Sequence, residues 1–238
     1  MTISHQASRR FRGPLSRFAR DGGGVMAVEL ALLAPFVIFV LFGMIELTDA
    51  ISAKRRVGFA ASIVGDLTTN QADDWVTTKE TEDLLALAGE VLLPYGITGT
   101  TVRITAVTYD DTKDEVVTVW SRQRNPDGTT SEATDAGYVA GDAFPDLDTS
   151  THLLPGETII TSGMNMIVAE VNYPFTSTLS NMFFPAFDIR MRELRVPRVT
   201  ARMRYCEPDE GTCSDGTVWD TTNCMPLDAV TGTTVSRC

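Results

Sequence analysis

A strongly apolar segment, Val25–Ile45, is the feature that most restricts how this chain can fold. Its 21 residues would rise about 31 Å as a helix, which matches the thickness of the hydrocarbon core of a bilayer. We therefore predict a transmembrane helix. A buried helix in a soluble core is the alternative, but such helices rarely run so long with Phe36, Phe39 and Phe42 on adjoining faces.

Charge is distributed unevenly on the two sides of this segment. Residues 1–24 carry five Arg against one Asp, whereas the chain from Val57 onward carries 12 Lys and Arg against 27 Asp and Glu, a net charge of −15. The Arg-rich side is expected to stay in the cytoplasm, although Lys54, Arg55 and Arg56 follow the span. We therefore expect a single-pass inner-membrane protein with a periplasmic or extracellular C-terminal domain. The acidic chain from Val57 onward is called the body below. Nucleic acid is not an expected partner, because the body would repel phosphate.

A carboxylate lies inside the apolar segment, although a charge at the bilayer centre costs about 2.5–3.5 kcal/mol on insertion scales. Glu29 follows Gly24 by five residues and stands behind the Arg-rich leader. This arrangement resembles the processing site of prepilins, where prepilin peptidase cuts after a Gly and leaves a Glu at the fifth position of the mature chain. The resemblance implies cleavage between Gly24 and Val25.

The resemblance extends along the helix. Residues 24–36 read GVMAVELALLAPF, and Glu46 follows one helical span later. This pattern resembles the TadE/TadG-like pseudopilins of the tight adherence (Tad) pilus system, and EVNYPF at 170–175 and RVPR at 195–198 are similar to further family features. It implies a non-enzymatic minor pilin or pseudopilin that contributes to pilus assembly and adhesion. Its implied partners are prepilin peptidase, the inner membrane and other pilin subunits, with Glu29 and Glu46 in subunit packing.

Two other targeting routes are disfavoured. The segment Ser8–Phe11 superficially resembles a twin-arginine signal, but Arg12 and Gly13 occupy positions that should be apolar. Small residues at 50–52 would suit conventional signal peptidase, which would release a soluble protein beginning at Ala53. The long apolar run, Glu29 and the acidic residues just before that cut all speak against this route.

The four cysteines are confined to the last 33 residues. They are Cys206, Cys213, Cys224 and Cys238. A zinc site is disfavoured because no two cysteines have the short spacing of zinc ligands and both His residues are distant in sequence. We predict two disulfides in an oxidising compartment, with free thiols as the alternative, and four cysteines leave three pairings open.

Apolar residues continue at helical spacing beyond the membrane, as at Val57, Ala60 and Val64. The membrane helix is therefore expected to extend into a stem. The expected domains are the basic leader 1–24, the transmembrane stem helix 25–67, the extracytoplasmic domain 68–205 and the disulfide-rich tail 206–238.

The extracytoplasmic domain is expected to combine one helix with strands. A helix is predicted over Thr78–Leu93, since Thr77 or Thr78 can cap it, acidic residues fill its early turns and Pro94 follows. From Thr100 apolar and polar residues alternate, and a turn at 110–114 predicts a hairpin.

Further along the chain, residues 125–157 are expected to form a long surface excursion. A strand follows over 167–173 and ends at Pro174, and one or two more lie within 189–203. The predicted fold class is α+β: a long N-terminal transmembrane helix, followed by a small mixed domain whose helix packs on an antiparallel sheet of about four strands.

No Gly-rich phosphate loop, nucleophile elbow or metal-ligand cluster is present in the sequence, so we predict no catalytic residue, no cofactor and no metal site. Asp142, Asp146 and Asp148 could bind calcium, but they lack a recognised loop spacing and a bidentate Glu. The main functional alternative is a permanently anchored envelope protein that binds a partner or calcium through its acidic domain. The second alternative is an unrecognised secreted hydrolase.

Overall fold

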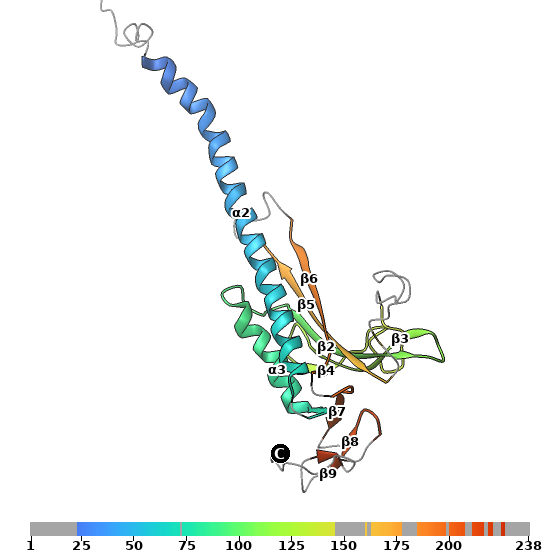
Figure 1. The fold of residues 1–238 in the computed structure, drawn as a ribbon. Coiled ribbons are helices and arrows are strands. Elements are labelled where there is room, and N and C mark those ends of the chain that lie inside the picture. Colours follow the sequence, from blue (N-terminus) through green and yellow to red (C-terminus); the bar gives the residue numbers. More distant parts are fainter. Residues whose placement is uncertain are drawn as a thin grey trace, which may run out of the picture. The chain divides into compact units, whose positions relative to one another are not determined.

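The computed structural model describes residues 23–71, 73–145, 160, 163–177, 185–198, 200–207, 211–216, 219–220 and 225–226 (Figure 1). The chain divides into two compact units between Thr48 and Asp49, and each is considered by itself. Most of the expected leader, residues 1–22, lies outside the described residues. The domain boundaries expected from the sequence therefore stay predictions.

Helix α2 spans Gly23–Thr69, a continuous run of 47 residues that contains Pro35. Among the described residues it is the one helix long and apolar enough to cross a membrane. The long N-terminal helix predicted from the sequence is thus confirmed, and it extends two residues past the expected end at Leu67. The first unit holds its apolar part, and the second unit begins with the remainder, from Asp49 onward.

Helix α3 (Thr78–Leu92) begins where a reciprocal cap satisfies its free N–H groups. The Thr77 hydroxyl accepts from the Glu80 N–H at 3.3 Å, and the Glu80 carboxylate accepts from the Thr77 N–H at 3.0 Å. The predicted helix and its cap are therefore confirmed. Figure 1 shows α3 beside the C-terminal half of α2, on the same face of the main sheet.

The main sheet has five antiparallel strands in the order β4-β3-β2-β5-β6. These strands are β2 (Thr101–Asp110), β3 (Glu115–Arg124), β4 (Thr130–Glu132), β5 (Asn165–Phe175) and β6 (Phe187–Arg195). The predicted α+β class and the hairpin at 110–114 are confirmed. The sheet exceeds the expected four strands by β4, whose three residues are too short to show alternation. Strand β5 continues past Pro174, because Phe175 still pairs with Phe187.

A smaller sheet was not anticipated. It consists of β1 (Trp75–Thr77), β7 (Arg204–Glu207) and β8 (Thr212–Cys213), and the β1–β7 pair is parallel. Two further short strands, β9 (Trp219–Asp220) and β10 (Met225–Pro226), pair with each other. Parallel pairing of segments so distant in sequence leaves no local turn signal by which it could be predicted.

The principal core lies between the two helices and the main sheet. It includes Val57, Ala61 and Val64 from α2, Leu85 from α3 and Ile104 from β2, each no more than 1% exposed. Small residues on α2 let the helix approach the strands closely. The packing explains why the C-terminal half of α2 belongs to the same compact unit as the sheet.

A second cluster covers the opposite face of the sheet. Ala106 joins the principal core while Val107 joins the second cluster, because adjacent residues of a strand face opposite sides of the sheet. Phe144 is buried there at 6% exposed, and Ala143 bridges to Val117. The expectation that residues 125–157 form only a surface excursion is therefore wrong for its described part, because apolar anchors within it pack on the sheet.

Candidate functional site

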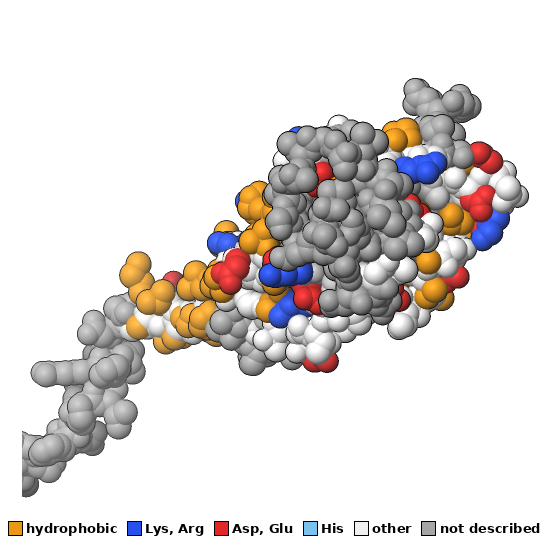
Figure 2. Space-filling model, turned by 90° about the horizontal axis from the view of Figure 1, so that it is seen from below, with side chains coloured by type: hydrophobic (Ala, Val, Ile, Leu, Met, Phe, Trp, Pro, Cys, Tyr) orange, Lys and Arg blue, Asp and Glu red, His pale blue; other side chains and the backbone are white. Residues whose placement is uncertain are grey.

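Large hydrophobic side chains are exposed along α2 throughout the first unit, where Glu29 is an exposed acid among them. Its large hydrophobic side chains from Val25 to Leu47 are 40–77% exposed, with Phe36 at 68%. Figure 2 shows hydrophobic side chains (orange) on the visible face of this part of the helix. Such exposure contradicts the alternative of a buried helix in a soluble core, because a core helix would be covered by its own fold. A helix with so much exposed apolar surface requires lipid or other helices as its surroundings.

The predicted processing site lies in the first turn of this helix. Gly24 and Val25 are both helical, and among the described residues a Cβ added at Gly24 would meet nothing within 4 Å apart from its chain neighbours and the backbone of its own helix. The first four N–H groups of a helix have no intrahelical partner, and Gly is a poor helix former, so this turn opens easily. Glu29 is exposed one turn further on. The described residues leave Gly24 uncovered, and cleavage after it stays a prediction.

Glu46 occupies a different environment from Glu29. Its side chain is only 2% exposed, whereas Glu29 is exposed. The two carboxylates were expected to share a role in packing between subunits, and that shared role stays a prediction. Their different exposure makes Glu29 the residue that a neighbouring helix can reach directly.

Hydrogen bonds connect the start of the second unit, at Asp49, to the loop after α3. The Tyr95 hydroxyl donates to the Asp49 carboxylate at 2.8 Å, and the Tyr173 hydroxyl donates to the Tyr95 carbonyl at 3.3 Å. Burial and the hydrogen bond to Asp49 raise the pKa of Tyr95. Arg56 adds a hydrogen bond to the Leu93 carbonyl. Because Asp49 immediately follows the apolar part of α2, the loop is held where the polar body begins.

Strand β6 makes a second set of polar contacts, which connect it to α2. The Arg195 guanidinium donates to the Asp66 carboxylate at 2.8 Å and to the Ser62 hydroxyl at 2.9 Å, both on α2. It also pairs with Glu193 at 2.9 Å. Arg195 belongs to the RVPR segment that was singled out in the sequence, but its role as a clamp on the helix was not foreseen. Asp66 and Ser62 lie more than 120 residues before Arg195 in the chain, so no local sequence pattern could reveal these contacts.

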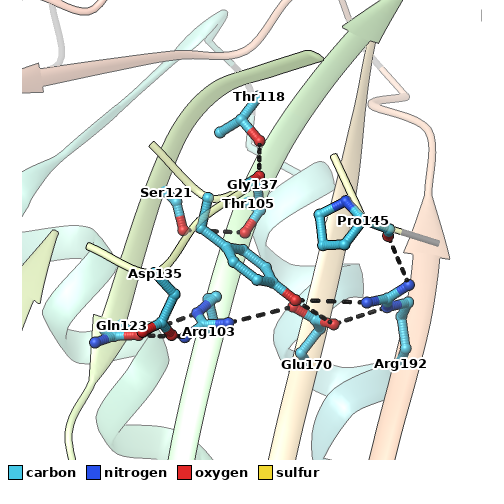
Figure 3. A network of polar contacts seen from close by, with 11 residues as sticks. Arg103, Thr105, Thr118, Ser121, Gln123, Asp135, Gly137, Pro145, Glu170 and Arg192 are labelled. Carbon is cyan, nitrogen blue, oxygen red and sulfur yellow. Dashed lines mark hydrogen bonds and ion pairs between the residues drawn. The ribbon is translucent and has the colours of Figure 1, made fainter. Parts of the chain in front are cut away.

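The sheet face opposite the helices carries a polar network (Figure 3). Figure 3 shows Glu170 of β5 between Arg103 of β2 and Arg192 of β6. Arg192 Nε donates to Glu170 at 2.7 Å, and Arg103 Nη1 lies 3.9 Å from the other carboxylate oxygen. The Tyr138 hydroxyl also donates to Glu170, at 3.2 Å. Burial and the nearby Glu170 carboxylate raise the pKa of Tyr138.

Aromatic contacts fix the arginines of this network in place. Arg103 lies over the Tyr138 ring at 3.8 Å from the ring centroid, and it also pairs with Asp135. Arg192 lies over the Phe144 ring at 5.2 Å. Both charged side chains are therefore held from two sides. Sequence reasoning did not find this network, although its charged residues occupy strand positions that alternate with core residues.

A cavity of about 700 Å³ adjoins the network. Its lining comes from β2, β5, β6 and the segment from Asp135 to Pro145. A smaller cavity of about 280 Å³ lies between β3 and the β7–β8 pair, with Trp120 and Tyr205 among its lining residues. Within the described part of the chain, no group of three or more His, Cys, Asp or Glu is placed to hold a metal ion.

The expected cysteine and calcium residues are only partly within the described chain. Cys206 and Cys213 form a disulfide that joins β7 to β8. Cys224 and Cys238 lie outside the described residues, so the second bond stays a prediction. Asp142 accepts a hydrogen bond from the Gly137 N–H at 3.1 Å. Its suggested calcium partners Asp146 and Asp148 also lie outside the described residues.

Comparison with known families identifies one segment of the chain. Residues 24–65 match the family model described as TadE-like protein. The match begins at Gly24, includes Glu29 and Glu46, and ends within the part of α2 that packs on the sheet. The resemblance to TadE/TadG-like proteins is therefore confirmed for this segment. No match was found among curated proteins or among solved structures.

Proposed function

We propose that this chain is a non-enzymatic minor pilin or pseudopilin of a Tad-type type IV pilus, which contributes to pilus assembly and adhesion. The observation that carries the proposal is the coincidence of the TadE-like match with the exposed apolar part of α2. In this role α2 anchors the subunit in the inner membrane and packs among the helices of other pilin subunits. The acidic body then lies on the periplasmic or extracellular side, as the Arg-rich residues 1–24 favour.

Processing by prepilin peptidase after Gly24 is the second element of the proposal. The cut removes residues 1–24 and leaves the whole apolar segment at the new N-terminus. A conventional signal-peptidase cut after Ser52 would instead remove Asp49, to which Tyr95 donates its hydrogen bond. Loss of this contact on conventional cleavage supports processing after Gly24.

Glu29 gives the processed helix a means of setting its register. Cleavage creates an α-amino group on Val25, and residues four apart on a helix lie on the same face, about 6 Å apart along the axis. The carboxylate can therefore pair with this cation on its own chain or on a neighbouring subunit. Leaving one member of a buried ion pair alone is strongly destabilising, by about 3–5 kcal/mol, so pairing between subunits would select one axial stagger.

The N-terminus of the membrane-extracted protein tests processing directly. Intact mass analysis and N-terminal sequencing are expected to give a chain that starts at Val25 and contains 214 of the 238 residues. A Gly24→Leu variant should retain its leader, whereas the matched Gly23→Ala variant should be processed normally. An N-terminus at Met1 in the assembled protein would favour the permanently anchored alternative, and one at Ala53 would favour conventional cleavage.

The pairing role of Glu29 is tested by a charge-removing substitution. Glu29→Gln keeps the shape of the side chain, so the variant should still enter the membrane. It should co-purify poorly with pilin subunits or fail to support piliation, because the Val25 cation loses its partner. Glu29→Asp, which keeps the charge, serves as the matched control and should assemble better than the Gln variant. Normal assembly of the Gln variant would leave Glu29 as an interfacial residue only.

A further inference from the structure

We propose that the consecutive cations Lys54, Arg55 and Arg56 bind the phosphate groups of anionic phospholipids at the bilayer surface from which the second unit emerges. All three side chains are exposed on α2, shortly after its apolar part. They lie on the side of the span where positive charge is not expected, and the proposed function gives them no role. The inference rests on the membrane anchoring proposed above and names the lipid that α2 meets as it leaves the bilayer.

These three cations have no acid beside them within the described chain, since none of them forms an ion pair with a described residue. Seven arginines of the body do form such pairs: Arg103, Arg122, Arg190, Arg192, Arg195, Arg198 and Arg204. Most cations of the body are thus matched by its own acids. The charges of residues 54–56 are left for anions outside the chain.

Exposed acids are also scarce near these cations. Asp49 is only partly exposed and accepts a hydrogen bond from the Tyr95 hydroxyl at 2.8 Å. In the last turn of α3, Glu90 is exposed. The exposed charges at this end of the second unit are therefore mainly positive, although the chain from Val57 onward has a net charge of −15. Such a local excess of Lys and Arg next to a membrane span attracts anionic headgroups.

The directions of the three side chains favour lipid over a single protein partner. Consecutive residues of an α-helix project about 100° apart, so Lys54 and Arg56 point in directions about 200° apart, with Arg55 between them. The helix face toward the sheet is marked by Ala53 and Val57, which are 0% and 1% exposed. A partner on one side of α2 could not meet all three cations. Headgroups can, because they surround a helix wherever it leaves the bilayer.

The position of the cations along α2 suits the headgroup layer. They follow Asp49, the first residue of the second unit, by five to seven residues, which is about 8–11 Å along the helix. The polar layer on each side of a bilayer is about 5–7 Å thick. Because Cα–Cβ bonds tilt toward the helix N-terminus, long Lys and Arg stems bring their charged ends back toward the membrane. The charges therefore reach the level of the phosphates.

Exposed apolar side chains accompany the cations. On α2, Ile51 is 45% exposed, and in the loop after α3 Leu93 is 54% exposed. The same loop is bound to α2 at two points, since Arg56 donates to the Leu93 carbonyl and Tyr95 donates to Asp49. Aliphatic, tyrosine and basic side chains in one place are typical of a surface at the boundary between headgroups and acyl chains.

The test uses the full-length protein reconstituted in phosphatidylcholine vesicles that contain a minor fraction of phosphatidylglycerol. Resistance to alkaline carbonate extraction first establishes insertion. Electron paramagnetic resonance then compares the association of phosphatidylglycerol and phosphatidylcholine, each spin-labelled on an acyl chain, with the protein. We expect a several-fold preference for phosphatidylglycerol. The double variant Lys54→Gln/Arg55→Gln should lose most of it, because each Lys or Arg at an anionic surface contributes roughly a fivefold change in affinity.

The matched control, Lys79→Gln/Arg198→Gln, removes the same charge from two other exposed side chains. Lys79 precedes Leu93 by 14 residues, about 20 Å along α3, and the Arg198 N–H donates to the Thr69 carbonyl at the C-terminal end of α2. This control should keep the lipid preference. Arg56 is left unchanged in both variants because it binds the loop, so neither should alter the unfolding temperature.

The possible failures are distinguishable. Complete extraction by carbonate would refute the membrane anchoring together with this inference. An inserted protein without preference for phosphatidylglycerol would overturn the inference alone, as would equal loss of the preference in the two double variants. If Lys54→Gln/Arg55→Gln keeps the lipid preference but no longer co-purifies with pilin subunits, the cations bind a protein partner and the proposal is wrong.

Discussion

The packing of α2 on the main sheet can be tested by adding one methyl group at two glycines of the same helix. At Gly65, a Cβ would lie 3.2 Å from Arg195 Cγ and 3.3 Å from the Cβ of Ala169. At Gly58, it would lie 3.0 Å from the terminal methyl carbon of Met191. Ala169 is a fully buried residue whose Cβ is attached to strand backbone, whereas the Met191 methyl ends a flexible side chain that can turn aside.

The expected difference follows from these contacts. Replacing Gly by Ala within a helix gains about 0.5–1 kcal/mol at either position, so this term cancels when the two variants are compared. Overpacking a core that cannot yield typically costs about 1–3 kcal/mol. Gly65→Ala should therefore be about 1–2 kcal/mol less stable than Gly58→Ala. For a chain of this size the gap corresponds to an unfolding temperature roughly 2–8 °C lower.

The measurement is thermal unfolding of both full-length variants in the same membrane mimetic, followed by circular dichroism at one fixed heating rate. The unmodified chain provides the reference, and Gly58→Ala should unfold close to it or slightly above it. If Gly65→Ala unfolds at the same temperature as Gly58→Ala or higher, α2 does not approach β5 as closely as described, and the reasoning from packing fails.

Three further predictions rest on the body. Arg195→Met removes the contacts of Arg195 with α2 and should lower the unfolding free energy by about 0.5–1.5 kcal/mol. Arg190→Met on the same strand should change it little. Equal effects of the two substitutions would show that the contacts of Arg195 with α2 do not stabilise the fold. All five tyrosines have a raised pKa, and at Tyr205 the main cause is burial. Because the fold favours the neutral phenol, the stability that the tyrosines contribute is complete below the ordinary pKa of 10.0 and is lost as the pH rises above it. Phenolate absorbance of the native protein should accordingly appear at higher pH than that of the denatured chain, and overlapping titrations would refute this. Replacing Cys206 and Cys213 together by Ala should cost about 2–3 kcal/mol, as loop closure predicts for a short loop, and an unchanged unfolding temperature would show that the bond does not stabilise the fold.

The elements that follow local rules could be predicted from the sequence. Helix α3 could be predicted because a cap at Thr77 or Thr78, acidic residues in its early turns and a stop at Pro94 all occur within one short stretch; the structure places the cap at Thr77. The β2–β3 hairpin was found because alternation of apolar residues and a turn occur within one short stretch. The segment from Gly24 was recognised because leader, glycine, carboxylate and apolar run stand at fixed spacings in the sequence.

The rest depends on contacts between distant segments. Strand β1 is three residues long and has no pattern of its own, and it forms only because β7 pairs with it. The Arg103–Glu170–Arg192 network requires three strands to align in register, as Arg103 with Glu170 and Glu170 with Arg192. Each of these residues alone is an ordinary charged strand residue, so composition and periodicity gave no reason to connect them.

The parallel pairing of β1 with β7 sets an order of folding events for the membrane-anchored subunit proposed above. Arg204 at the start of β7 donates to Asp74, 130 residues earlier, at 2.7 Å. If the chain is exported as proposed, β1 emerges directly after α2, whereas β7 follows only when most of the body has crossed the membrane. Contacts so distant in sequence form late, and until then β1 presents an unpaired edge. In the proposed role the body would complete its fold while already tethered to the membrane, and a chain that stops short of Arg204 would leave the β1 edge unpaired.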